Sequence, residues 1–179
     1  MKLLLIFLIT MSTAVYGVNL KKHPIYAQIK KNKPSLSKKY AMKLSNVIYK
    51  AARKHKIPAK IYTAILMQES GYSLKAKGCH KGILETETST GIALTEGTIC
   101  SDFGISQIYF RTARVYSIDI ARLTTDLEYS VMAGAKVLKF FKRYSKKDKN
   151  WFTRYNCGTR GTTKRDTCQI YKKLVERYL

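Results

Sequence analysis

The chain has 179 residues, of which 34 are Lys or Arg and 11 are Asp or Glu, so its formal net charge is +23. This length is sufficient for one domain with a proper hydrophobic core, and the charge favours an anionic partner such as nucleic acid, acidic lipid or the carboxylate-bearing cell wall. The sequence has neither zinc-finger spacing nor the aromatic–basic signature of an RNA-binding sheet, so specific nucleic-acid recognition is not expected.

The first 17 residues have the layout of a secretory signal peptide. Lys2 precedes an apolar stretch, Leu3 to Ile9, and small residues lead to a cleavage point after Gly17. The alternative is a membrane anchor, but the apolar run is shorter than a spanning helix needs and Thr10 ends it. We therefore expect an exported protein, periplasmic or extracellular, for which the cell wall is the favoured anionic partner.

Four cysteines in an exported chain indicate disulfides. Three pairings are possible, and we expect Cys79–Cys100 and Cys157–Cys168 because each closes a local loop. Zinc is the competing use, but the sequence has no CxxC pair, and only His80 lies near a cysteine. We predict no metal and no cofactor.

Residues 18–36 are basic and lack a sustained apolar period, which predicts an extended N-terminal arm ahead of a domain at 37–179. Helical periodicity begins at Ser37, and a second helix is predicted from Pro58 to Ser70, ended by Gly71. Residues 71–103 are expected to form a long loop. Further helices are predicted over 106–116, from Thr125 or Asp126 to at least Phe141, over 151–155, and over 165–178. The fold class is all-α, or α with a minor β or loop insertion.

Glu69 is the residue that most needs an explanation. Ile61, Ile65 and Glu69 are spaced i, i+4, i+8, so the carboxyl continues a stripe that should face the core. Burial and the negative end of the helix dipole would raise its pKa, and the acidic segment 82–102, which contains no Lys or Arg, would raise it further if this segment folds over Glu69. A protonated glutamic acid near neutral pH suits a general acid for glycosidic cleavage. The alternative is a helix-end glutamate that leans into solvent.

Four short motifs occur in order along the chain. They are Gln68-Glu69-Ser70, then Gly104-Ile105-Ser106-Gln107-Ile108, then Gly134 within a helix, then Tyr155-Asn156-Cys157-Gly158. This pattern resembles the lysozyme-like soluble lytic transglycosylase family over roughly residues 38–160. The segments 102–104 and 118–127 are similar to its small exported branch, which is associated with secretion and conjugation systems. The resemblance implies a lysozyme-like helical domain with a catalytic cleft.

The resemblance also implies residue roles. Glu69 matches the catalytic acid, and Ser70 would contact the sugar or orient Glu69. Gln107 would line the cleft, the phenol of Tyr155 would bond the catalytic carboxyl, and Asn156 would fix the turn beneath that tyrosine. Each could instead be purely structural: Ser70 a cap, Gln107 a loop residue, Tyr155 a core aromatic.

The activity implied is cleavage of the MurNAc–GlcNAc β-1,4 bond of peptidoglycan glycan strands, with formation of a 1,6-anhydromuramyl product. Two alternatives stay open: a muramidase that uses water, for which Asp102 is the nearest second carboxylate, and a binding module that has lost the chemistry. Expected partners are the glycan strands and a secretion, conjugation or phage-entry machine, and the protein is expected to be a monomer. Trp151, Tyr72 and Tyr109 are candidates for stacking on sugars.

Overall fold

The computed structural model describes residues 24–88, 91–145, 148–159, 164 and 166–179, with the backbone alone over 84–88 and 91–95. The predicted signal peptide, residues 1–17, lies outside the described residues. In the described part of the chain, no helix combines the length and the apolar character needed to cross a membrane.

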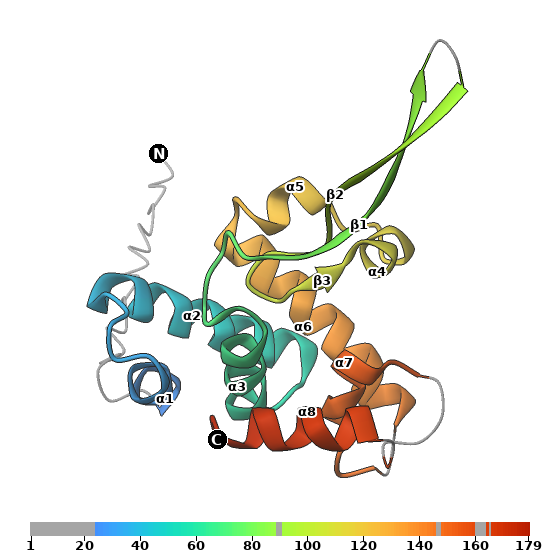
Figure 1. The fold of residues 1–179 in the computed structure, drawn as a ribbon. Helices are drawn as coiled ribbons and strands as arrows, with labels where there is room; N and C mark the ends of the chain where they lie inside the picture. Colours follow the sequence, from blue (N-terminus) through green and yellow to red (C-terminus); the bar gives the residue numbers. More distant parts are fainter. Residues whose placement is uncertain (1–23, 89–90, 146–147, 160–163, 165) are drawn as a thin grey trace, which may run out of the picture.

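Helices make up most of the described chain, and a small antiparallel sheet in the order β1-β2-β3 is inserted between them (Figure 1). The helices are α1 (Pro24–Asn32), α2 (Lys38–His55), α3 (Ala59–Ser70), α4 (Phe110–Val115), α5 (Ile120–Leu123), α6 (Leu127–Tyr144), the 3-10 helix η2 (Trp151–Thr153), α7 (Arg154–Cys157) and α8 (Asp166–Glu176). The strands are β1 (Lys77–Thr88), β2 (Gly91–Phe103) and β3 (Ile108–Tyr109). This confirms the predicted mainly helical fold with a minor β insertion.

The capping residues place the long helices where the sequence predicted them. The Ser37 hydroxyl accepts a hydrogen bond from the Tyr40 amide at the start of α2. Gly71, at φ 57°, ends α3 in the left-handed conformation that suits glycine. Asp126, rather than Thr125, caps α6 by accepting from the Tyr129 amide at 3.0 Å. The Gly71 cap fixes the end of α3, and with it the position of the residues just before Gly71.

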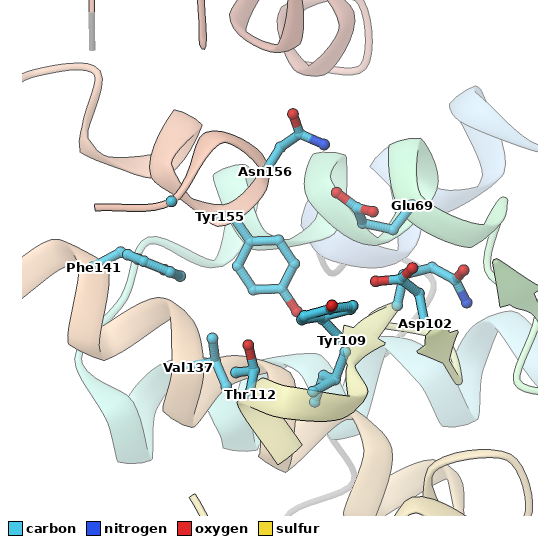
Figure 2. Close-up of a pocket in the computed structure, with 11 residues that line it drawn as sticks. Glu69, Asp102, Tyr109, Thr112, Val137, Phe141, Tyr155 and Asn156 are labelled. Atoms are coloured by element: carbon cyan, nitrogen blue, oxygen red, sulfur yellow. The ribbon is translucent and has the colours of Figure 1, made fainter. Parts of the chain in front are cut away.

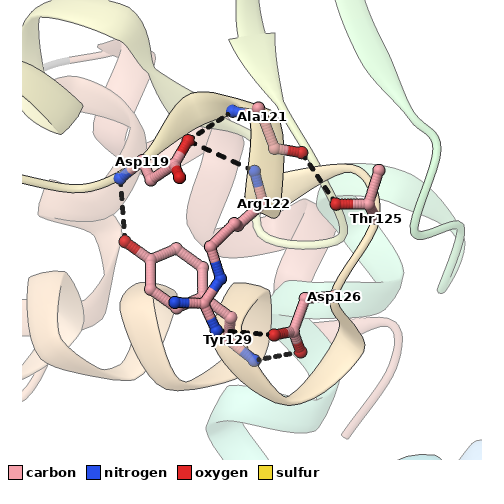
Figure 3. A network of polar contacts seen from close by, with 6 residues as sticks. All are labelled: Asp119, Ala121, Arg122, Thr125, Asp126 and Tyr129. Carbon is pink, nitrogen blue, oxygen red and sulfur yellow. Dashed lines mark hydrogen bonds and ion pairs between the residues drawn. The ribbon is translucent and has the colours of Figure 1, made fainter.

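A polar network joins α5 to α6 (Figure 3). Asp119 caps α5 through the Ala121 amide, and its own amide donates to the Tyr129 hydroxyl at 2.8 Å. Arg122 pairs with Asp126 at 2.7 Å and also lies over the Tyr129 ring at 4.0 Å. The two helices are therefore held together on the solvent side as well as through their apolar residues.

The predicted extended N-terminal arm is wrong over residues 24–32, which form α1. Ile25 and Ile29 lie on one face of this helix and are buried, Ile29 completely, in the main core. Gln28 donates to the Lys60 and Tyr178 carbonyls at 3.0 and 2.8 Å, which ties α1 to α3 and to the C-terminal end of the domain. An apolar face of two residues in a lysine-rich segment is too short to produce a visible period.

The predicted loop at 71–103 is also wrong, because β1 and β2 form a long hairpin that extends away from the helices (Figure 1). The predicted pair Cys79–Cys100 forms a disulfide across these two strands. The second predicted pair, Cys157–Cys168, is also formed and joins α7 to α8. A projecting two-stranded ribbon has no core face to fill, so its sequence carries little of the alternation by which strands are recognised.

The buried apolar residues form two clusters. The main core is formed by α1, α2, α3, α6 and α8, while a smaller cluster of β3, α4, α5 and α6 contains Ile108, Leu123 and Val137. The expected helix over 106–116 begins only at Phe110, because residues 104–107 form a tight turn and Ile108–Tyr109 pairs with β2. Tyr155 packs against both clusters.

Candidate active site

Glu69 lies at the carboxyl end of α3 and faces a cavity of about 360 Å³ (Figure 2). The cavity lies between the main helical core and the part of the molecule that carries β3 and α4. Its lining residues are Glu69, Asp102, Gln107, Ile108, Tyr109, Thr112, Val137, Phe141, Tyr155, Asn156 and Gly158. Of the predicted site residues, Glu69, Gln107, Tyr155 and Asn156 therefore meet at one cavity, whereas Ser70 is not among the lining residues.

The environment of Glu69 favours its protonated form. Burial raises the pKa of Glu69 to about 7; the Tyr171 hydrogen bond opposes this rise, and the negative charge of Asp102 adds to it. The acidic segment 82–102 does not fold over Glu69, because the hairpin extends away from the helices (Figure 1). Asp102, at the base of the hairpin, lines the cavity.

Tyr171 of α8 is the direct partner of Glu69, and the sequence did not reveal it. Its hydroxyl donates a short hydrogen bond to Glu69 Oε1. Burial, followed by the nearby Glu69 charge, raises the pKa of Tyr171 well above its ordinary value, so the phenol stays protonated and remains a donor. The signal in the sequence was the helical spacing of Cys168, Tyr171 and Val175, which are buried on one face of α8. This spacing is equally typical of core packing.

Tyr155 does not bond the Glu69 carboxyl, which corrects the role that the resemblance implied. Its hydroxyl donates instead to the Ser106 carbonyl at 2.7 Å. Ser70 Oγ donates to the Ile105 carbonyl at 2.8 Å and to the Leu66 carbonyl at 3.1 Å. Ser70 and Tyr155 therefore hold the turn at 104–107 from two sides, close to Glu69.

The turn at 104–107 packs tightly on α6 at Gly134. A Cβ added at Gly134 would come within 2.2 Å of Ser106 Oγ and within 2.6 Å of the Tyr62 hydroxyl. Ser106 is completely buried, and its hydroxyl lies 3.2 Å from the Tyr62 hydroxyl. Glycine at this position of α6 is thus a packing requirement that lets the turn reach the cavity floor.

Asp102 and Gln107 lie side by side in the cavity because β2 pairs with β3. The backbone pairing sets Asp102 opposite Tyr109, and Ser101 Oγ donates to Asp102 Oδ2 at 2.5 Å. Gln107 adopts φ 43°, and its side-chain amide donates to the Gly104 carbonyl at 2.8 Å. A Cβ at Gly78 would lie within 3.2 Å of both side chains, so the base of the hairpin closes tightly over this edge of the cavity.

The three aromatic residues proposed for sugar stacking separate into two groups. Trp151 and Tyr72 are buried in the main core and do not line the cavity. Tyr109 is 40 % exposed and lines the cavity together with Tyr155 (Figure 2). Asn156 is exposed at the rim. In the described part of the chain, no three His, Cys, Asp or Glu side chains gather in a way that could hold a metal ion.

A mainly helical domain with a largely buried glutamate facing a cavity beside two apolar clusters is typical of lysozyme-like domains. The family model for the transglycosylase SLT domain matches residues 46–174. The chain belongs to this family, whose members are lytic transglycosylases that act on peptidoglycan. Comparison with curated proteins and with solved structures gave no match.

Proposed function

We propose that this protein is an exported peptidoglycan lytic transglycosylase that cleaves the MurNAc–GlcNAc β-1,4 bond and leaves a 1,6-anhydromuramyl end. The observation that carries the proposal is the position of Glu69, whose pKa is raised to about 7 at the edge of a cavity that also holds Gln107, Tyr155 and Asn156. A carboxyl of this pKa is present in both protonation states near neutral pH, as a group that first donates and then accepts a proton requires.

In the proposed first step, the protonated Glu69 donates its proton to the oxygen that links the two sugars, and the bond from that oxygen to the anomeric carbon breaks. The acetamido group of the muramic acid stabilises the positive charge at that carbon. Glu69 is now a carboxylate, and the Tyr171 hydroxyl donates to it. A hydrogen bond to a charged group contributes about 1.5–3 kcal/mol, so Tyr171 favours the state that the first step produces.

In the second step, the Glu69 carboxylate takes the proton of the 6-hydroxyl of the same sugar. The freed oxygen forms a bond to the anomeric carbon, which closes the anhydro ring and returns Glu69 to its protonated form. No water and no second carboxylate enter the reaction. Glu69 is the catalytic residue of this scheme, whereas Ser70 and Tyr155 position the turn that carries Gln107.

The second candidate is a muramidase, which the presence of Asp102 in the same cavity favours. Asp102 could activate a water molecule or stabilise the charged sugar, as the second carboxylate of a glycosidase does. Asp102 Oδ2 already accepts a hydrogen bond from the Ser101 hydroxyl. The negative charge of Asp102 also raises the pKa of Glu69.

Mass spectrometry of the products separates the two functions. Purified peptidoglycan is digested with the wild-type protein, and the released muropeptides are weighed. A transglycosylase gives anhydro ends, which are lighter by one water than the reducing ends that a muramidase gives. Anhydro ends support the proposal, whereas reducing ends from the first time points onward would assign the hydrolytic reaction. Asp102→Asn serves as the matched variant, since only the hydrolytic scheme requires a second carboxylate.

The proposed location follows from the predicted signal peptide together with the disulfides. Cys79–Cys100 and Cys157–Cys168 use all four cysteines of the chain. Disulfides of this kind persist in oxidising compartments, where the cell wall is also found. Cell fractionation tests the location. The producing cell is separated into cytoplasm, periplasm and culture medium, and the chain is detected in each fraction.

A further inference from the structure

The cavity that holds Glu69 continues into a second and larger one. This second cavity, of about 670 Å³, lies between α4, α6 and the end of α7. It shares Tyr109, Thr112, Phe141 and Gly158 with the first, so the two form one groove. Figure 2 shows Phe141 and Thr112 on the side of the cavity away from Glu69. We call the second cavity the aromatic chamber; its further lining residues are Arg111, Val115, Tyr116, Phe140, Cys157 and Thr159.

Apolar side chains are exposed in the aromatic chamber instead of being covered by the core. Phe140 is 40 % exposed and Val115 is 77 % exposed. The ring of Phe140 lies 5.9 Å from that of Tyr116 and 5.5 Å from that of Phe141, in edge-to-face contacts that form one continuous surface. A contiguous exposed apolar surface next to a catalytic cavity is typical of a ligand-binding site.

The charge of the groove changes sign along its length. As far as the described side chains go, the Glu69 end holds the carboxyls of Glu69 and Asp102, and no cationic side chain lines it. Among the described residues, the aromatic chamber is lined by Arg111 and by no carboxylate. Among the ion pairs formed between described residues none involves Arg111, and its guanidinium lies 5.7 Å from the Phe110 ring. An anionic group of the ligand is therefore favoured at the chamber end and disfavoured beside Glu69.

We propose that the aromatic chamber binds the peptide stem of the peptidoglycan strand, with Arg111 holding a stem carboxylate and the ring surface covering the apolar part of the peptide. This inference rests on the proposed function and adds substrate choice to it: the protein prefers strands that carry stems over bare glycan. In a stem-bearing strand the lactyl carboxyl of MurNAc is held in the amide bond to the stem, so the carboxylates that such a strand offers to Arg111 belong to its stems. A stem carries free carboxylates and methyl-bearing side chains, which match the charge and the apolar lining of the chamber.

The test compares two substrates: glycan strands with intact stems, and the same strands after an amidase has removed the stems and left a free lactyl carboxylate on each MurNAc. Because the stripped strands are anionic too, a preference for stem-bearing strands cannot arise from net charge alone. KM and kcat are measured for the wild type and for Arg111→Gln and Phe140→Ala. Arg53→Gln is the matched control, because Arg53 also lies over an exposed ring, that of Tyr49 at 5.6 Å, but on α2 outside the groove. Loss of one charge-assisted contact changes affinity about tenfold.

The expected result is a KM for stem-bearing strands about tenfold below that for stripped strands in the wild type. Arg111→Gln and Phe140→Ala reduce this ratio toward one, with kcat little affected, and Arg53→Gln keeps it. Equal KM values for both substrates in the wild type would overturn the inference. An equal rise in KM for both substrates in Arg111→Gln would also overturn it, since the chamber would then bind the glycan itself.

Failure of the proposed function gives a different pattern. The wild type would then release no anhydro product from either substrate. Binding of both strand types to the Glu69→Gln protein, measured by sedimentation with the insoluble strands, reports on the chamber without turnover. Tighter binding of stem-bearing strands supports the chamber inference in that case too, and equal binding contradicts it.

Discussion

The Tyr171 hydroxyl donates a hydrogen bond to a carboxyl oxygen of Glu69, although 102 residues separate them in the chain. α3 supplies the acid and α8 supplies its partner, and the Cys157–Cys168 disulfide joins α8 to the helix that carries Tyr155. The chemistry proposed for Glu69 therefore depends on how the last helix is held against the rest of the domain.

Replacing Tyr171 with Phe should lower kcat by about tenfold or more, because the ionised Glu69 loses a hydrogen bond to a charged group, worth about 1.5–3 kcal/mol. The same bond lowers the pKa of Glu69, so its loss should also move the alkaline limb of the rate profile to higher pH. Rates measured from pH 5 to pH 9 check both effects.

Tyr155→Phe is the matched control for this change. It removes an equally buried hydroxyl that donates to the Ser106 carbonyl instead of to Glu69. It should lower the free energy of unfolding by about 1–3 kcal/mol and leave the alkaline limb in place. A shift of that limb in Tyr155→Phe equal to the one in Tyr171→Phe would contradict the assignment of Tyr171 as the partner.

The pH dependence of activity and that of stability should both reflect Glu69. Because its pKa is raised to about 7, the acid form is lost and the rate falls as pH rises through about 7. The raised pKa also means that the fold binds the proton more tightly than the unfolded chain does. The resulting stability is fully present below the unfolded pKa near 4.5 and is lost as pH rises toward 7.

Urea unfolding at pH 4 and at pH 8 measures this contribution. A shift of this size corresponds to up to about 3 kcal/mol. Glu69→Gln should therefore lose less stability than the wild type between the two pH values, by up to that amount. An identical pH dependence in the two proteins would show that the carboxyl does not titrate abnormally.

Removing the Cys157–Cys168 disulfide by a double change to Ser should lower the free energy of unfolding by about 3 kcal/mol, the chain-entropy value for a loop of this size. It should also lower kcat, because α8 carries Tyr171. The double change at Cys79 and Cys100 is the comparison: it frees the hairpin without releasing α8. Unfolding curves and initial rates distinguish the two, and a larger loss of kcat without the hairpin disulfide would contradict the dependence on α8.

Gly134→Ala should destabilise the fold by about 1–3 kcal/mol through overpacking, since its Cβ would come within 2.2 Å of Ser106 Oγ. Ser106→Gly removes that atom, so the double variant Gly134→Ala, Ser106→Gly should recover part of the loss. Thermal unfolding of the three variants measures the coupling. A double variant whose loss is the sum of the two single losses would show that the two positions do not meet.

The sequence predicted much of the site because its motifs are local and ordered. Glu69 ends a helix whose boundaries are set by Pro58 and Gly71, so both its place and its partial burial could be read from the spacing. Gln107 also lines the cavity as expected, whereas Asn156, which was expected to fix the turn beneath Tyr155, lies exposed at the rim of the cavity. Tyr171 could not be found in this way, since its role arises only when α8 packs against α3, and a buried tyrosine on an amphipathic helix looks like core.

The errors in the fold have two physical sources. The hairpin was missed because a ribbon held by its own pairing and by Cys79–Cys100 needs no alternating apolar face. Helix α1 was missed because Ile25 and Ile29 are its main apolar anchors in a segment whose lysines dominate the composition. For α1, tertiary contacts with the main core decided the structure, whereas the hairpin is held by its own pairing and needs no pattern of apolar residues.

The most direct test of the central claim is the rate at which wild-type and Glu69→Gln proteins release soluble muropeptides from purified peptidoglycan at pH 6. Glu128→Gln, an exposed glutamate on α6 that pairs only with Lys50 at 3.8 Å among the described residues, is the matched control. A positioned proton donor contributes about 10² to 10⁴ in rate, so Glu69→Gln should fall by at least that factor while Glu128→Gln keeps wild-type activity. Release by Glu69→Gln within a few-fold of the wild type would contradict the account.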